Sequence, residues 1–322
     1  MNPPFSITGK ILTQISNIER LIGRVESFDH PKPQPQLRKS NRVRTLQGSL
    51  AIEGNSLDLE QVTAILDGKP VIAPKNDIQE VLNANAVYEN LLSYKPTNTK
   101  DLLKAHGLMM KDLITESGRW RTGNVGIMKG DQVSHMAPPA DRVPHLMTDL
   151  FKFLKSDNHE LIKGCVFHYE FEFIHPFQDG NGRMGRFWHT VLLREYHEVF
   201  EYIPLESVIK DHQKQYYRVL EQCDKAADST PFIEFSLEMI LAALNDFIDV
   251  FRPPVTTPKA RLEQASTHFS NKEFSRKDYM QLHKSISTAT ASRDLKYGVD
   301  NNLLEKHGEK VLTIYMFIIS SI

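Results

Sequence analysis

The chain has 322 residues, of which 40% are hydrophobic and 25% are charged, and its formal net charge is -1 at pH 7. These values are ordinary for a globular protein, so they exclude wholesale disorder and a global electrostatic attraction to nucleic acid or acidic membranes. Cys165 and Cys223 do not have metal-ligand spacing, and no apolar run is long enough to cross a bilayer. Because the start also lacks the pattern of a secretory signal, the sequence predicts a cytoplasmic protein.

Apolar residues recur at helical spacing through most of the chain, for example at residues 12–25 and 232–251. The predicted fold class is therefore mainly α. Proline-rich stretches at residues 30–36 and 252–258 cannot continue a helix, because proline lacks the amide donor. The second stretch follows a long predicted helix, so we expect it to be a linker between domains.

Residues 49–55, SLAIEGN, have the pattern of a helix end. Ser49 and Glu53 are four residues apart and share a helix face, and Gly54 suits a C-terminal cap. A negative charge at this end of a helix is mildly unfavourable. Glu53 is thus either a solvated acid or the partner of a basic group elsewhere in the chain.

Residues 124–139 break the helical pattern, since short β-type runs flank Lys129, Gly130 and Asp131. A Gly-Asp pair between alternating neighbours predicts a β-hairpin. An isolated hairpin is marginally stable, so this one either packs over a site or decorates the surface of the helical body.

The segment HPFQDGNGRMGR, residues 175–186, is the densest motif in the chain. An apolar helical pattern leads into it over residues 161–174, and Pro176 then disfavours helix at His175. The stretch DGNG is turn chemistry, after which a helical pattern resumes. The sequence therefore predicts a helix, a tight loop and a second helix.

Such a loop points unpaired backbone N–H groups at a common point, where the dipole of the second helix also favours an anion. Arg183 and Arg186 are three apart in the first turn of that helix, and their guanidinium groups suit phosphate. Asp179 offers a hard oxygen to Mg²⁺, and His175 can accept a proton from a hydroxyl near neutral pH. Each residue alone has a plain structural explanation, but together they predict transfer of a phosphorus group from a nucleotide to a hydroxyl.

The same segment matches every fixed position of the motif of the Fic family, which it closely resembles. The resemblance implies a protein adenylyltransferase that moves AMP from ATP to a Ser, Thr or Tyr hydroxyl of a target protein, with Mg²⁺. A divergent branch transfers phosphate and departs within the Gly-Asn-Gly stretch, which is intact here. By resemblance the base is His175, the metal ligand is Asp179, and the groups that bind the phosphates are Gly180, Asn181, Gly182, Arg183 and Arg186.

The resemblance extends to the predicted hairpin and to a pair of tyrosines. The hairpin is similar to the family's flap, which binds target protein by strand addition and contacts the nucleotide; the corresponding residues are Val133, Ser134, His135 and Met136. Tyr216 and Tyr217 resemble a position near the adenine, although an aromatic pair in a core is an equal interpretation. Asp224 stands where relatives often carry Asn.

SLAIEGN resembles the family's inhibitory motif, in which the glutamate pairs with the second arginine of the central motif. This implies that Glu53, supported by Ser49, pairs with Arg186 and restrains transfer. In some relatives the glutamate instead positions a water that removes AMP from the target, and the sequence leaves both directions open. It also leaves open a homodimer that buries this helix. The implied organisation is an N-terminal helical region with this motif (1–100), a Fic core with a β-hairpin flap (101–251), the linker (252–258) and a C-terminal domain (259–322).

The C-terminal domain has a pattern of helix, turn and helix followed by two short strands around His307 and Gly308, with Ser287 as a helix N-cap. It resembles a small winged helix, an α+β fold. From residue 259 to 322 there are ten Lys or Arg and seven Asp or Glu, and this difference of +3 is weak for DNA binding. A protein-interaction module is an equal alternative.

Two other functions compete with adenylyl transfer. His168, Glu172 and His175 recur at helical spacing, and with Asp179 they could form the metal site of a hydrolase. That alternative leaves both arginines unexplained. The second is a DNA-binding regulator whose core senses nucleotide without catalysis, but such a sensor has no need of the base.

Overall fold

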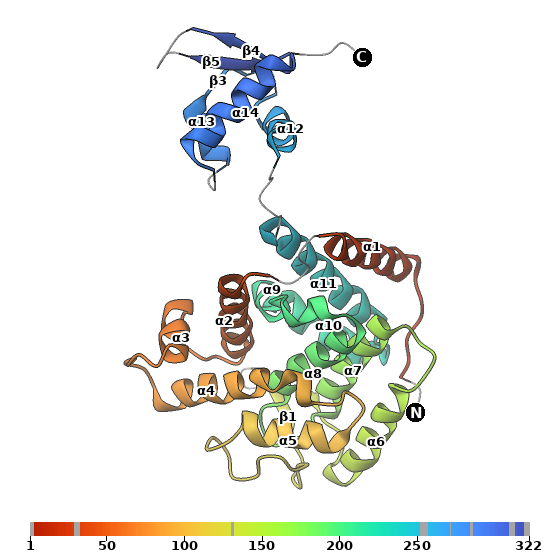
Figure 1. The fold of residues 1–322 in the computed structure, drawn as a ribbon. Coiled ribbons are helices and arrows are strands. Elements are labelled where there is room, and N and C mark those ends of the chain that lie inside the picture. The colour runs from red at the N-terminus through yellow and green to blue at the C-terminus, as the bar shows by residue number, and fades with distance from the viewer. Residues whose placement is uncertain are drawn as a thin grey trace. The chain divides into compact units, whose positions relative to one another are not determined.

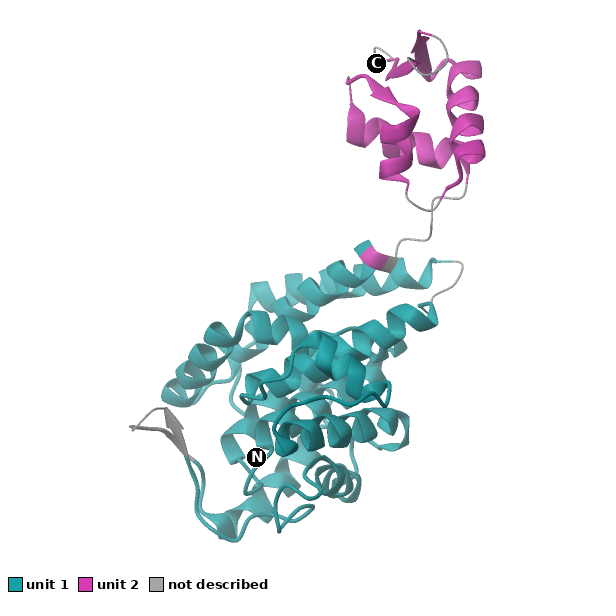
Figure 2. Ribbon diagram, turned by 90° about the vertical axis from the view of Figure 1, so that its left-hand side faces the viewer, with its two compact units in different colours: residues 1–249 teal, residues 250–322 magenta. Residues whose placement is uncertain are grey.

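Helices dominate the structure, as the apolar spacing predicted. The computed structural model describes residues 3–28, 33–129, 132–251, 257–270, 272–283, 286–308 and 313–318, and within these it has fourteen α-helices. The chain divides into two units, residues 1–249 and 250–322 (Figure 2). Most of the predicted linker, residues 252–256, lies outside the described residues.

Among its described residues, unit 1 has helices and one hairpin as its regular secondary structure (Figure 1). Its elements are α1 (Gly9–Glu26), α2 (Pro35–Ile52), α3 (Leu59–Leu66), α4 (Lys75–Glu89), η1 (Leu91–Ser93), α5 (Thr99–Met109), β1 (Gly126–Lys129), β2 (Gln132–Met136), η2 (Ala140–Arg142), α6 (Val143–Phe153), α7 (Glu160–Ile174), α8 (Asn181–Tyr196), η3 (Glu198–Glu201), α9 (Leu205–Asp211), α10 (Gln213–Ala226) and α11 (Thr230–Phe251).

The core of unit 1 is built on α7 and α8, which pack against each other (Figure 1). Helix α7 is apolar on most of its circumference and almost wholly buried, which is the pattern of a central helix. Side chains from α2, α4, α5, α6 and both central helices share one hydrophobic cluster, which includes Leu46, Val87, Phe167 and Trp188. Residues on both sides of position 100 therefore belong to the same core.

Helix α2 brings the SLAIEGN motif to the centre of the unit. It packs along α9 and also contacts α3, α4 and α8. Gly48 faces α9 so closely that a Cβ there would lie 2.7 Å from the Cα of Ser207. The helix ends at Ile52, with Glu53 as its C-cap, so the predicted helix end is confirmed.

The predicted hairpin is confirmed as an antiparallel pair of β1 and β2. The register shifts between Ile127 and Met128, so one strand carries a local irregularity. Gly130 and Asp131, the predicted turn, lie outside the described residues.

Unit 2 has a hydrophobic core of its own, which includes Leu262, Phe274, Tyr279 and Leu295. Its elements are α12 (Pro258–Phe269), β3 (Phe274–Ser275), α13 (Arg276–Leu282), α14 (Thr288–Asp300), β4 (Leu304–His307) and β5 (Ile314–Phe317). Ser287 caps α14, as predicted. The sequence predicted two strands, but the sheet has the order β3-β5-β4, because the short β3 before α13 also pairs with β5.

Within the part of the chain that is described, none of the helices combines the length and the apolar character needed to cross a bilayer.

Candidate active site

His175 lies where α7 ends. Its backbone has φ 50° and ψ 61°, a left-handed C-cap, so the chain leaves the helix as Pro176 led us to expect. The ring nitrogen Nδ1 lies 3.4 Å from the carbonyl oxygen of Glu172. Because a carbonyl can only accept a hydrogen bond, Nδ1 carries the proton in this contact and Nε2 is the nitrogen that can act as a base.

The loop between the two central helices is closed by Asn181. Its side chain both accepts from the backbone N–H of Phe177, at 2.8 Å, and donates to the carbonyl of Phe177, at 2.9 Å. Gly180 has φ 81° and precedes α8, whose first-turn amides have no intrahelical acceptor. The side chain of Asn181 thus shapes the loop, and the backbone amides at this helix start are the groups that can bind an anion.

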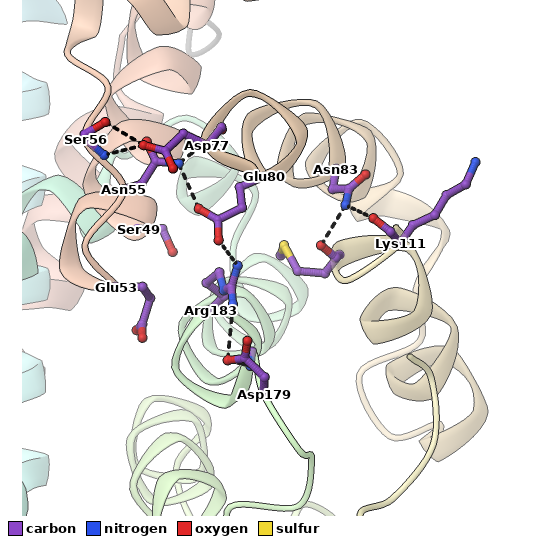
Figure 3. Close-up of polar contacts among 12 residues, drawn as sticks. Ser49, Glu53, Asn55, Ser56, Asp77, Glu80, Asn83, Lys111, Asp179 and Arg183 are labelled. Atoms are coloured by element: carbon purple, nitrogen blue, oxygen red, sulfur yellow. Dashed lines mark hydrogen bonds and ion pairs between the residues drawn. The ribbon is translucent and has the colours of Figure 1, made fainter. Parts of the chain in front are cut away.

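Arg183 lies between two carboxylates (Figure 3). Its Nη1 donates to Glu80 at 2.8 Å, and its Nη2 lies 3.4 Å from Oδ1 of Asp179. The side chain of Arg183 is 5% exposed, whereas that of Asp179 is 59% exposed. Asp179 therefore stands at the surface of the loop and Arg183 beneath it.

Arg186 is held by the end of α2. Its Nη2 donates to Glu53 at 2.6 Å and to the carbonyl oxygen of Ser49 at 3.0 Å, and its Nε donates to the Ser49 hydroxyl at 3.3 Å. Burial is the largest single influence on the pKa of Arg186 and lowers it, but Glu53, Tyr216 and Glu172 together outweigh burial, so the pKa of Arg186 is raised. The pair expected between Glu53 and Arg186 is thus present in the structure.

The carboxylate of Glu53 also lies against the motif loop itself. A Cβ at Gly182 would overlap with Oε1 of Glu53, so a larger residue there would have to displace the Glu53 carboxylate. Glu53 consequently occupies space beside the helix start where an anion would bind.

A buried polar cluster lies behind Arg186. Glu172 and His168 share a face of α7, with 3.9 Å between Oε1 and Nε2, and Nε2 of His168 is also 3.1 Å from the hydroxyl of Tyr216. Burial raises the pKa of Glu172 to about 7 and holds the pKa of His168 well below its usual range. His168 is therefore neutral and Glu172 is partly protonated near neutral pH.

The two predicted adenine-side tyrosines have different environments. Tyr216 is buried among aromatic rings, including Phe232, whereas Tyr217 is 44% exposed and donates to the carbonyl of Ile52 at 3.3 Å. Their contact with a nucleotide stays a prediction. Asp224 accepts a hydrogen bond from Tyr169.

Val133, Ser134, His135 and Met136 lie on β2, paired with β1, but their side chains are outside the described part of the structure. Their contacts with nucleotide and target protein stay predictions.

The sequence analysis missed Arg121. Its guanidinium is buried and donates to four backbone carbonyls, two at the end of α7 and two at the base of the hairpin, on His175, Ile174, Gly123 and Pro138. It thereby ties the hairpin to the backbone of the catalytic histidine candidate.

His106 on α5 was also missed. Its ring stacks on Phe177 with centroids 3.6 Å apart, its Nδ1 accepts from Gly118 N–H, and its Nε2 donates to the Asp179 carbonyl at 3.0 Å. Burial lowers its pKa to about 4, so it is neutral and each ring nitrogen has a fixed role. His106 therefore supports the loop from below.

The residues fit Mg²⁺ better than a transition metal. No group of three or more His, Cys, Asp or Glu side chains within the described residues is placed to hold a metal ion. The set proposed for a hydrolase, His168, Glu172, His175 and Asp179, is therefore not assembled. One exposed carboxylate beside an anion-binding helix start suits Mg²⁺, which takes few protein ligands and completes its shell with phosphate and water oxygens.

Comparison with known proteins agrees with this geometry. Residues 96–193 match the model of the Fic/DOC family. The crystal structure of a Fic family protein from Desulfovibrio desulfuricans G20 is 42% identical in sequence, with a TM-score of 0.76, and the match covers 100% of this chain and 99% of that one. The chain belongs to the Fic family.

Similarity to relatives with named activities is more distant. This Fic protein is 27% identical over 210 residues to the protein adenylyltransferase Fic of Culex quinquefasciatus, and 25% identical over 243 residues to the protein adenylyltransferase fic-1 of Caenorhabditis elegans. These matches cover 61% and 70% of this chain but 40% and 46% of the relatives, so it spans less than half of the curated relatives. A structure of C. elegans Fic-1 shares the fold, with a TM-score of 0.61 and 21% identity, over 74% of this chain and 72% of that one.

Proposed function

We propose that this protein is a cytoplasmic protein adenylyltransferase that transfers AMP from ATP to a Ser, Thr or Tyr hydroxyl of a target protein and is restrained by Glu53. The observation that carries the proposal is a complete motif loop whose buried Arg186 is bound by Glu53. A structural loop has no need of two buried arginines at a helix start, where their charge opposes the dipole.

Each residue has a defined task in this reaction. The target hydroxyl oxygen attacks the α-phosphorus, the bond from that phosphorus to the β-bridging oxygen breaks, and pyrophosphate leaves with the electron pair. Nε2 of His175 takes the hydroxyl proton, and the amides that start α8 bind the phosphate oxygens. Mg²⁺, held by Asp179, would offset the charge of the phosphates. The target peptide would add to the hairpin as a further strand.

Glu53 acts as the restraint because it neutralises Arg186 and fills space beside Gly182. A carboxylate here repels a triphosphate and competes for the same guanidinium. Removing the restraint with Glu53→Gly should therefore raise AMP transfer, whereas removing the base with His175→Ala should abolish it.

The test is transfer of α-labelled ATP to protein, with Mg²⁺, by the wild type, by Glu53→Gly, and by Glu53→Gly combined with His175→Ala. We expect label on protein with the single variant, at least about tenfold more than with the wild type, since a hydrogen-bonded carboxylate that competes for the buried Arg186 is worth about 1.4 kcal/mol or more. The double variant should place no label on protein. Absence of label on the enzyme and on every protein of a cell lysate would refute the proposal, and γ-labelled ATP would then test phosphate transfer.

A further inference from the structure

Helix α4 carries three polar residues, spaced three apart, whose side chains contact three different segments (Figure 3). Asp77 accepts hydrogen bonds from the backbone and hydroxyl of Ser56, and Asn83 donates to the carbonyls of Met109 and Lys111. Between them Glu80 accepts from Arg183. The helix is thus fixed at three points, and the middle one is an arginine of the motif.

Glu80 is the stronger of the two carboxylate partners of Arg183. It lies 2.8 Å from Nη1 and its side chain is 20% exposed, whereas Asp179 is 3.4 Å from Nη2 and 59% exposed. A guanidinium that is only 5% exposed needs a close counter-charge to stay buried and charged. Glu80 supplies that charge.

The two acids contact different ends of the guanidinium and lie on opposite sides of it in Figure 3. Asp179 belongs to the anion-binding loop, whereas Glu80 reaches the arginine from α4. A phosphate at the loop can therefore take Nη2 while Nη1 keeps its bond to Glu80. By this geometry Glu80 orients Arg183 and does not compete with the phosphate for it.

Glu80 is in turn held by the turn that carries Glu53. The amide of Asn55 donates to Oε2 of Glu80 at 2.8 Å and to the carbonyl of Asp77 at 3.1 Å. The backbone N–H of Asn55 donates to the carbonyl of Leu50 in α2. The turn of residues 53–55 thus reaches Arg186 directly, through Glu53, and Arg183 through Asn55 and Glu80.

We propose that Glu80 is a positioning residue that orients Arg183 toward the phosphates beyond the α-phosphate. We also propose that Asn55 links this orientation to the turn of residues 53–55, which carries the inhibitory Glu53. The inference rests on the proposed function, since it assumes that ATP binds at the loop. It predicts that removing the Glu80 carboxylate lowers the affinity for ATP but not the affinity for AMP.

The test measures the Kd of ATP and of AMP by calorimetry, with Mg²⁺, in the full chain carrying Glu53→Gly. Adding Glu80→Ala should raise the Kd of ATP about tenfold, the usual cost of one charge-assisted hydrogen bond, and leave the Kd of AMP within about twofold. Glu80→Gln, which keeps an acceptor, should restore part of the loss. Asn55→Ala should raise the Kd of ATP by a smaller factor. Glu89→Gln removes the same charge from an exposed position on the same helix and serves as the control.

The outcomes separate the inference from the function on which it rests. An unchanged or lower Kd of ATP in Glu80→Ala overturns the positioning role, and equal losses of ATP and AMP assign Glu80 a structural role instead. An unchanged Kd in Asn55→Ala overturns the coupling. If Glu53→Gly transfers AMP while Glu80→Ala binds ATP normally, only the inference fails. If Glu53→Gly neither binds ATP nor transfers AMP, the proposed function fails and takes the inference with it.

Discussion

At the scale of one residue, Arg121 connects two elements, because its guanidinium donates to carbonyls both at the end of α7 and at the base of the hairpin. Lysine keeps the charge but cannot reach these acceptors with a single ammonium group. Arg121→Lys in the Glu53→Gly background should lower the free energy of unfolding by about 2–3 kcal/mol and lower kcat about tenfold or more. Urea unfolding and labelled transfer measure both quantities. Arg119→Lys, at an exposed position, is the control; equal kcat in the two variants would contradict the role assigned to Arg121.

Glu172 gives stability a pH dependence. Burial raises its pKa to about 7 from 4.5, so the folded state binds an extra proton between these values. The resulting stabilisation is present below the unfolded pKa and is lost as pH rises through the folded pKa. The free energy of unfolding of the wild type, relative to Glu172→Gln, should therefore fall by roughly 3 kcal/mol from pH 4 to pH 8.

Urea unfolding at several pH values measures this difference, with the exposed Glu195→Gln on α8 as a control for general charge effects. A difference that stays constant across the range would show that Glu172 keeps the same charge throughout.

At the scale of elements, the position of α2 against α9 sets the position of Glu53. A Cβ at Gly48 would lie 2.7 Å from backbone atoms of Ser207, so Gly48→Ala must move one of these helices. We expect a loss of about 1–3 kcal/mol in stability and several-fold more AMP transfer than wild type, because the displaced α2 withdraws Glu53 from Arg186. Labelled transfer and thermal unfolding measure the two effects.

Gly23→Ala in α1 is the matched control, since a Cβ there meets no atom within 4 Å. Its alanine should leave transfer unchanged and add up to about 1 kcal/mol of stability, because alanine favours helix. Destabilisation by Gly48→Ala without any rise in transfer would show that α2 does not set the restraint.

Elements were predictable where their signals are local. The end of α7 followed from Pro176, although the left-handed conformation of His175 was not predicted, and the hairpin followed from a Gly-Asp turn between alternating residues. Arg121, His106 and Glu80 escaped prediction because the partners that tie them to the central motif are 54, 73 and 103 residues away. Backbone carbonyl acceptors are also present at every residue, so the sequence does not indicate which of them accept a hydrogen bond. The polar stripe of Asp77, Glu80 and Asn83, spaced three apart beside apolar positions of α4, was a signal that could have marked this face.

At the scale of the whole molecule, each unit has a hydrophobic core of its own. The cluster around Trp188 draws on residues of unit 1, and the cluster around Tyr279 draws on residues of unit 2. Arg261 and Asp294 add a buried ion pair inside unit 2, and Tyr279 donates to the same carboxylate. The described site residues all belong to unit 1. We therefore expect the units to fold separately and the chemistry to reside in the first.

A chain of residues 1–251 carrying Glu53→Gly should transfer AMP at a rate within about threefold of the full-length variant, because the described site residues all belong to unit 1. A threefold difference in rate corresponds to less than about 1 kcal/mol of activation free energy. Residues 257–322 alone should unfold cooperatively, and their binding to DNA duplexes at two salt concentrations tests the DNA-reading alternative. A folded 1–251 chain that loses transfer would mean that unit 2 delivers the target protein or completes the site. Retained transfer together with salt-sensitive duplex binding by unit 2 would join two independent activities in one chain.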